Sequence, residues 1–153
     1  MTAEKTLIVA GATGYGAWPA NSLEGAERCM AAPVDGIEID VQMTADGHVV
    51  AHHDYWLNPD ATRLGGDWLA ERGAPLKTLS LDALKRYDIG RARPGSAAEA
   101  QHPDLESLDG ARIPTLPALL AALKAAEGPR RLIYVEIKTH PNHPDYAPDP
   151  AAV

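Results

Sequence analysis

Short apolar runs, separated by glycine, proline and charged residues, set the pattern of this chain. Four of them have the length and the β-branched content of strands, at residues 6–10, 35–41, 48–52 and 131–138. We expect the first and the fourth to be buried. Asp46-Gly47 separates the second run from the third and is a turn signal. These two runs are too close for a crossover helix, so a hairpin or a tight non-helical connection is predicted between them.

Two helices are predicted between the strands, each with a polar residue at its start. The first is capped by Asn21 or Ser22 and runs to Met30. The second covers residues 117–127 and is capped by Thr115. The resulting order of strand, helix, two strands, insertion, helix and strand is that of an α/β protein.

The periodicity weakens over residues 54–110, where glycine, proline and charge are scattered. A region of this length predicts a small insertion or a long connection between a strand and a helix. Within it, Ser80 is placed to cap a short amphipathic helix over residues 81–88. The proline-rich residues 139–153 are predicted to be a loop tail, and the whole of residues 1–153 one partial domain.

Carboxylates interrupt two of the apolar strands. Glu38 and Asp40 are two residues apart, so both point to one face of a strand and can share a cation. Glu136 lies in the fourth strand and could supply a third ligand, while Lys138, on the same face as Glu136, could neutralise a phosphate. Oxygen ligands of this kind suit Mg²⁺ or Ca²⁺. The alternative is an edge strand whose acids are solvated.

His53 follows the third strand directly. A histidine at a strand end near carboxylates is suited to be a general acid or base, because its charge changes near neutral pH. Asp54 could orient a turn or the imidazole, and His52, on the opposite face, is expected to be structural.

Taken together, these segments resemble the glycerophosphodiester phosphodiesterase family. The matching pieces are WPANSLEGA (18–26), GIEIDVQMTADGHVVAHHD (36–54), LNPDATR (57–63), LSLDALKRYDIGR (79–91), ARIPTLPALL (111–120) and YVEIK (134–138). The resemblance implies a TIM-type (β/α)₈ barrel with its site at the carboxyl ends of the strands. It also implies metal-dependent hydrolysis of glycerophosphodiesters to an alcohol and glycerol 3-phosphate, a reaction of lipid and glycerol metabolism.

By the same resemblance, one divalent cation, Mg²⁺ or Ca²⁺, would be bound by Glu38, Asp40 and Glu136. His53 would be the general acid or base, and Lys138 would contact the phosphate of a small-molecule substrate.

The chain departs from the family after the first strand. The family has a His-Arg-Gly triplet there, and the equivalent positions here are Ala12, Thr13 and Gly14. One general acid or base contributes about 10²–10⁴-fold in rate, and an arginine adds charge stabilisation. The sequence therefore predicts an active-site fold with severely reduced turnover.

The length of the chain is the second departure. A TIM barrel takes about 250 residues, whereas this chain has 153 residues and four predicted barrel strands. We therefore expect a truncated N-terminal portion of the barrel, or a chain that needs a complementing C-terminal half or an oligomer.

Composition excludes several other classes. A formal net charge of -7 argues against nucleic acid as a partner. No run approaches the roughly 18 apolar residues of a membrane span, and no signal peptide is recognisable. Cys29 is the single cysteine and forms no internal disulfide, so the cytoplasm is the expected location. A periplasmic or exported location stays open if the N-terminus has been altered.

Two alternative functions remain. One is a non-catalytic relative that binds a metal or a phosphodiester without turnover. The other, less favoured, is a dinucleotide-binding Rossmann-type protein, because Gly11, Gly14 and Gly16 approach that fingerprint. Trp18-Pro19 interrupts the helix that such a loop requires.

Overall fold

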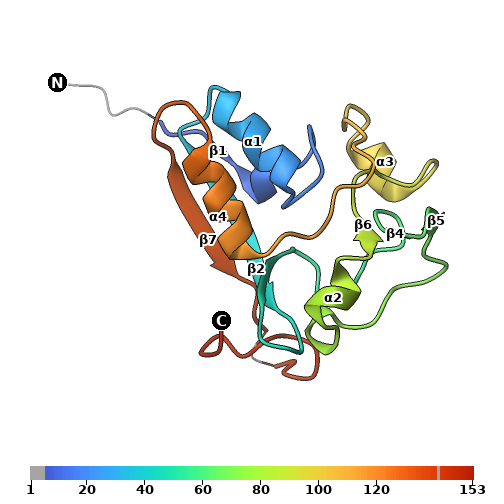
Figure 1. Cartoon of the computed structure of the whole chain (residues 1–153). Coiled ribbons are helices and arrows are strands. Elements are labelled where there is room, and N and C mark those ends of the chain that lie inside the picture. Colours follow the sequence, from blue (N-terminus) through green and yellow to red (C-terminus); the bar gives the residue numbers. More distant parts are fainter. Residues whose placement is uncertain (1–5, 141) are drawn as a thin grey trace.

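A four-stranded sheet forms the centre of the computed structural model, which describes residues 6–140 and 142–153. Its central strand is β2 (Gly36–Met43). β1 (Val9–Ala10) and β7 (Leu132–Ile137) both pair with it in parallel, and because both have Gly36 as a partner they lie at its opposite edges (Figure 1). β3 (Val49–Ala51) pairs antiparallel with the end of β2, which confirms the predicted hairpin.

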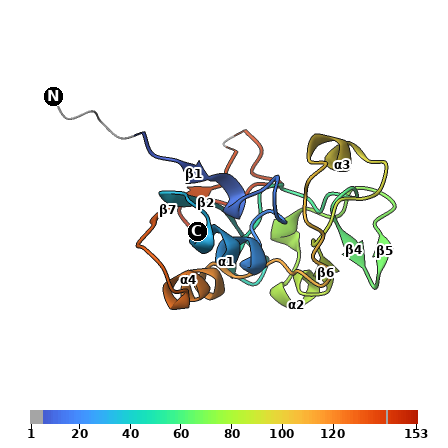
Figure 2. The same cartoon turned by 90° about the horizontal axis from the view of Figure 1, so that it is seen from above.

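Two helices, α1 (Leu23–Ala31) and α4 (Leu116–Ala125), lie side by side on one face of this sheet (Figure 2). Ser22 is the cap of α1, and its hydroxyl accepts a hydrogen bond from the Gly25 N–H at 2.9 Å. Thr115 caps α4 as predicted. Buried apolar residues of both helices and the sheet form one core: Ala26, Cys29, Met30, Ile37, Ile39, Val41, Ala51, Leu119 and Leu123.

The side chains of β2 alternate between two environments. Ile37, Ile39 and Val41 belong to the core shared with the helices. Because consecutive side chains of a strand point to opposite faces, Glu38, Asp40 and Gln42 lie on the other face. The polar face of β2 is therefore where the candidate site is built.

Residues 54–110 contain a second, three-stranded sheet of β4 (Arg63–Leu64), β5 (Asp67–Trp68) and β6 (Tyr87–Asp88). The 3₁₀ turn η2 (Leu76–Thr78) and the short helices α2 (Leu81–Leu84) and α3 (Ala97–Gln101) lie in the same region. A second apolar cluster joins this region to Val50 and Ile113 of the flanking segments. Its assignment as an insertion stays a prediction.

The helix predicted over residues 81–88 is wrong in its second half. α2 ends at Leu84, and Tyr87-Asp88 forms β6 instead. Ser80 does cap α2, through a hydrogen bond to the Ala83 N–H. The helical spacing of Tyr87 was overridden because β6 pairs with Arg63 and Leu64 of β4, a partner distant in sequence.

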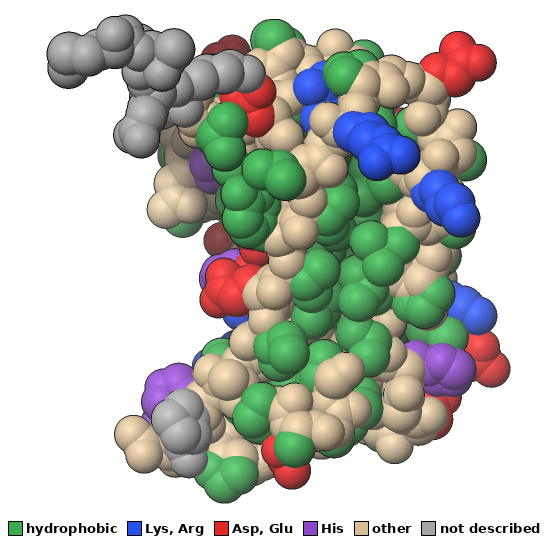
Figure 3. All heavy atoms as spheres, turned by 90° about the vertical axis from the view of Figure 1, so that its left-hand side faces the viewer, with side chains coloured by type: hydrophobic (Ala, Val, Ile, Leu, Met, Phe, Trp, Pro, Cys, Tyr) green, Lys and Arg blue, Asp and Glu red, His purple; other side chains and the backbone are tan. Residues whose placement is uncertain are grey.

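Two strands expected to be buried are exposed. The first strand is limited to Val9–Ala10, and Leu7, Ile8 and Val9 are 49%, 58% and 41% exposed as residues. β7 is a strand as predicted, yet all six of its residues are exposed. Within the described residues, β7 pairs with β2 alone, so its other edge has no neighbour. Figure 3 shows the resulting concentration of apolar side chains on this side of the molecule.

The glycine-rich segment after β1 does not introduce a helix. Gly11–Thr13 forms a 3₁₀ turn, η1, and the next helix starts at Leu23. Gly14 has a φ of +87°, and a Cβ atom there would come within 2.7 Å of the Trp18 ring. This glycine therefore serves a tight turn and close packing, and the dinucleotide-binding alternative is wrong.

Within residues 6–140 and 142–153, none of the helices combines the length and the apolar character needed to cross a lipid bilayer.

Candidate active site

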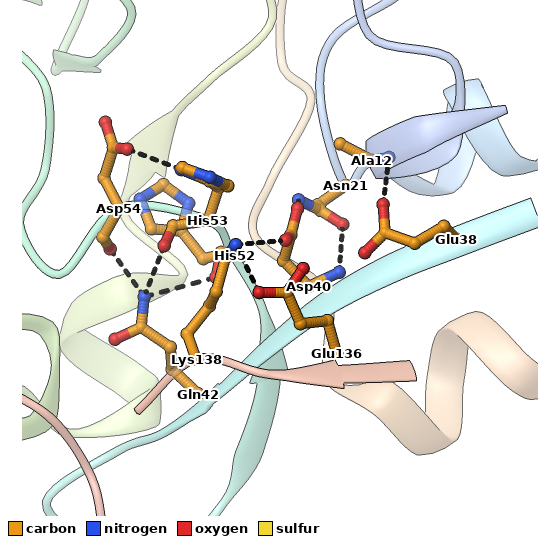
Figure 4. A network of polar contacts seen from close by, with 10 residues as sticks. All are labelled: Ala12, Asn21, Glu38, Asp40, Gln42, His52, His53, Asp54, Glu136 and Lys138. Atoms are coloured by element: carbon orange, nitrogen blue, oxygen red, sulfur yellow. Dashed lines mark hydrogen bonds and ion pairs between the residues drawn. The ribbon is translucent and has the colours of Figure 1, made fainter. Parts of the chain in front are cut away.

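Three carboxylates from two adjacent strands converge on the polar face of the sheet. Asp40 of β2 is the registered partner of Glu136 of β7, and Glu38 lies two residues before Asp40. One carboxylate oxygen from each of the three lies within 4.8 Å of the others (Figure 4). The structure thus brings together the three acids that the sequence analysis selected, and the group could hold a metal ion.

Glu38 has one satisfied and one unsatisfied oxygen. Its Oε2 accepts a hydrogen bond from the Ala12 N–H at 2.7 Å. Its Oε1 is buried and has no hydrogen-bond partner among the described residues. Burial raises the pKa of Glu38, and the negative charges of Asp40 and Glu136 raise it further, against the lowering effects of the Ala12 N–H and Lys138. An oxygen in this environment, next to two further carboxylates, fits a hard divalent cation.

Asp40 is held from both sides. Asn21 donates from Nδ2 to Asp40 Oδ2 at 2.8 Å and accepts from the Asp40 N–H at 3.0 Å. Asn21 has a φ of +52°, a conformation in which non-glycine residues are uncommon. On the other side, Lys138 Nζ lies 3.0 Å from Asp40 Oδ1. Asp40 is only 2% exposed. These contacts together fix the orientation of its carboxylate.

Lys138 joins the two strands of the site. Its Nζ is also 2.9 Å from Glu136 Oε1. Burial alone would lower the pKa of Lys138, but the hydrogen bonds to Glu136 and Asp40 outweigh it, and the pKa is raised. Lys138 therefore keeps its positive charge beside the acidic group.

His53 lies after β3, with Nδ1 at 2.8 Å from Asp54 Oδ1. Of the two roles considered for Asp54, the structure shows the contact with the imidazole. Gln42, fully buried on the polar face of β2, donates from Nε2 to the carbonyl oxygens of His52, His53 and Asp54. The same-face spacing of Glu38, Asp40 and Gln42 is a signal for this residue that the sequence analysis did not use.

Ala12 and Thr13 occupy different surroundings. Ala12 lines a cavity of about 210 Å³ together with Tyr15, Asn21 and His53. Thr13 is fully buried, and its hydroxyl lies 3.5 Å from the Ser22 carbonyl oxygen at the start of α1. Position 12 thus faces the candidate site, whereas the side chain of position 13 contributes to packing.

A second, larger cavity of about 490 Å³ is also lined by His53. Glu136 and Lys138 form part of its wall, and Trp56 and Arg72 another part. The latter two belong to the region without strong periodicity, and no pattern in the sequence pointed to them.

Known proteins match this chain over most of its length. Residues 11–148 match the glycerophosphoryl diester phosphodiesterase family. Glycerophosphodiester phosphodiesterases of Caldanaerobacter subterraneus subsp. tengcongensis and Bacillus subtilis are 35% and 29% identical to it, over 56% and 94% of this chain and 32% and 44% of theirs. A putative glycerophosphoryl diester phosphodiesterase from Silicibacter pomeroyi superposes with a TM-score of 0.78 at 27% identity, over 88% of this chain and 47% of that one.

The sheet and helices are those of the N-terminal portion of a TIM-type (β/α)₈ barrel. The chain belongs to the glycerophosphoryl diester phosphodiesterase family. It spans less than half the length of the two curated relatives and of the solved structure.

Proposed function

We propose that this chain forms the metal and phosphodiester site of a hydrolase that cleaves glycerophosphodiesters, and that its own turnover is severely reduced. The observation that carries the proposal is the convergence of Glu38, Asp40 and Glu136 within 4.8 Å, with one buried oxygen of Glu38 left without a hydrogen bond. The cation is Mg²⁺ or Ca²⁺, because three carboxylates and no cysteine or histidine make up the group.

In the reaction, water adds to phosphorus, the bond between phosphorus and the alcohol oxygen breaks, and one proton of that water is transferred to the alcohol oxygen. A cation held by Glu38, Asp40 and Glu136 would supply positive charge to the phosphate and make phosphorus more electrophilic. Lys138 contacts a phosphate oxygen, which its retained positive charge supports. His53 moves the proton as general acid or base, and Asp54 holds the imidazole at 2.8 Å.

Reduced turnover is inferred from position 12. An alanine methyl group lines the cavity beside His53, so no second proton-transfer group stands at that position. Loss of one such group lowers a rate by about 10²–10⁴-fold. A non-catalytic relative that only binds the cation and the phosphodiester is therefore the second candidate.

The partners of the chain are part of the proposal. The exposed apolar residues of β7 support a complementing set of strands, provided by a C-terminal half or by an oligomer. The cytoplasmic location and the role in lipid metabolism stay predictions.

The first test is calorimetry of this chain with Ca²⁺ or Mg²⁺ and then with sn-glycerol 3-phosphate. We expect the cation to bind, glycerol 3-phosphate to bind in its presence, and both signals to be lost in Glu38→Gln. Asp67→Asn, which removes an exposed carboxylate of β5, is the matched control and should bind as the parent does. Equal cation binding by Glu38→Gln and the parent would contradict the proposed ligand set.

The second test is hydrolysis of glycerophosphocholine by the parent, Ala12→His and Ala12→His/Thr13→Arg. The single variant is included because Thr13 is buried and an arginine there disturbs packing. A gain of about 10²-fold or more in Ala12→His supports the hydrolase assignment. Cation and phosphate binding without a gain in either variant favours the binding-only relative.

A further inference from the structure

The larger cavity beside the site has a wall that the proposed reaction does not use. One side consists of His53, Glu136 and Lys138, which belong to the candidate site. The lining also includes Trp56 and Arg72, which do not belong to that site. With a volume of about 490 Å³, the cavity can hold more than a phosphate group.

Arg72 is positioned by stacking. Its guanidinium carbon lies 4.1 Å from the centre of the Trp56 ring, a distance at which cation–π attraction is effective. Trp56 in turn packs against Tyr146, with ring centres 4.5 Å apart. Backbone contacts also hold the segment that contains Trp56 against the segment that follows Arg72. Trp56 forms a β-bridge with Pro75, and the Leu76 N–H donates a hydrogen bond to the Tyr55 carbonyl oxygen.

The guanidinium of Arg72 has no acidic partner among the residues that the structure describes. By contrast, Arg28, Arg63 and Arg91 each form an ion pair with a carboxylate. The N–H donors of the Arg72 guanidinium are therefore available to a ligand in the cavity. A planar guanidinium matches the geometry of a carboxylate or a phosphate.

The same arrangement disfavours a cationic group. A quaternary ammonium binds best over the open face of an aromatic ring, but one face of Trp56 already carries Arg72. A second positive charge beside the guanidinium would also be repelled by Arg72. The carboxylates of the same lining, Asp54 and Glu136, are already in contact with His53 and Lys138.

We propose that Trp56 and Arg72 form a subsite for the alcohol portion of the substrate and select an alcohol that carries an anionic group such as a carboxylate. This inference rests on the proposed function, because it places the phosphate at Lys138 and the acidic group. The alcohol then extends along the cavity toward Arg72.

The test compares two ligands that differ by one carboxylate. Binding of glycerophosphoserine and glycerophosphoethanolamine is measured by calorimetry with the full chain in the presence of Ca²⁺. We expect the parent to bind glycerophosphoserine about threefold to fivefold more tightly, because one charged contact at an exposed arginine contributes up to about that much. In Arg72→Gln this preference should disappear, while the affinity for sn-glycerol 3-phosphate stays within about twofold.

Arg112→Gln is the matched control, because Arg112 is exposed and does not line the cavity. It should keep the preference, and thermal melting of each variant reports whether the fold is intact. The subsite is wrong, and the proposed function stands, if the parent binds glycerol 3-phosphate but binds glycerophosphoserine and glycerophosphoethanolamine equally well. The same conclusion follows if Arg72→Gln keeps the preference of the parent for glycerophosphoserine. If glycerol 3-phosphate does not bind to the parent, both are wrong.

Discussion

The side-chain amide of Gln42 lies 2.6 Å from the carbonyl oxygen of Asp54. The same nitrogen is 3.2 Å and 3.1 Å from the carbonyl oxygens of His52 and His53. Three consecutive backbone carbonyls thus converge on one buried donor. The main chain around His53 is therefore fixed by Gln42, which lies two residues after Asp40 on the same face of β2. The carboxylates of β2 and the imidazole of His53 are thus positioned by the same strand.

Replacement of Gln42 by methionine should therefore destabilise the protein. Methionine has a similar size but no donor, and the partly buried carbonyl groups lose their partner, which costs about 1 kcal/mol. Urea denaturation measures the change. Gln42→Glu should be at least as destabilising, because a carboxylate would face three carbonyl oxygens. Parent-like stability of Gln42→Met would show that water replaces the amide.

Replacement of Lys138 by methionine should make the protein more dependent on a cation. Asp40 and Glu136 lose their shared positive partner, and removal of one member of a buried ion pair costs about 3 kcal/mol. Glu136 is half exposed, which reduces this figure. A bound cation supplies the missing charge, so the melting temperature of Lys138→Met should rise more on addition of Ca²⁺ than that of the parent. An equal rise in both proteins would argue that the cation binds elsewhere.

The feature of the site that the sequence predicts best is which residues of β2 point to the same face of the strand. Glu38 and Asp40 alternate with isoleucines, so their common face follows from the two-residue period of a strand. The register that brings Glu136 opposite Asp40 depends on pairing between segments nearly one hundred residues apart, so the sequence alone offered Glu136 only as a candidate third ligand.

Other features depend on tertiary context that no local pattern contains. The composition of β7 identifies a strand, but the exposure of its apolar residues depends on which neighbours are present. Tyr87 has helical spacing and is nevertheless drawn into β6 by pairing with Leu64. Arg72 and Trp56 come from a segment without periodicity, so only their stacking in the folded chain marks them.

The burial of His52 predicts a pH dependence of stability. Burial lowers the pKa of His52 below its ordinary value of 6.5, although the charge of Asp54 acts in the opposite direction. With the folded pKa below the unfolded one, the contribution to stability is complete above about pH 6.5 and is lost as the pH falls through the folded pKa. Melting temperatures of the parent and His52→Gln, compared from pH 8 down to about pH 5, isolate this effect. The parent should lose more stability on acidification than the variant, and parallel profiles would contradict the assignment.

The thiol of Cys29 offers a measure of how tightly α1 packs on the sheet. Burial raises the pKa of this thiol to about 11, and the side chain belongs to the core. Iodoacetamide reacts with the thiolate, so at pH 8 modification should be slow in the folded chain and rapid in denaturing urea. Because the chain has one cysteine, the mass shift is unambiguous. Rapid modification without denaturant would show that this core opens readily.

Asn21 combines a strained backbone with two hydrogen bonds to Asp40, and glycine and alanine substitutions separate these roles. Both variants lose the bonds to the carboxylate and the N–H of Asp40. At a φ of +52° glycine is unstrained, whereas alanine is disfavoured by roughly 1–2 kcal/mol. Asn21→Ala should thus be less stable than Asn21→Gly by about that amount in urea denaturation. If the reciprocal bonds orient Asp40 as a ligand, both variants should bind Ca²⁺ more weakly than the parent in calorimetry, and by similar factors. A loss of affinity in Asn21→Ala alone would instead trace the effect to the backbone conformation of the loop.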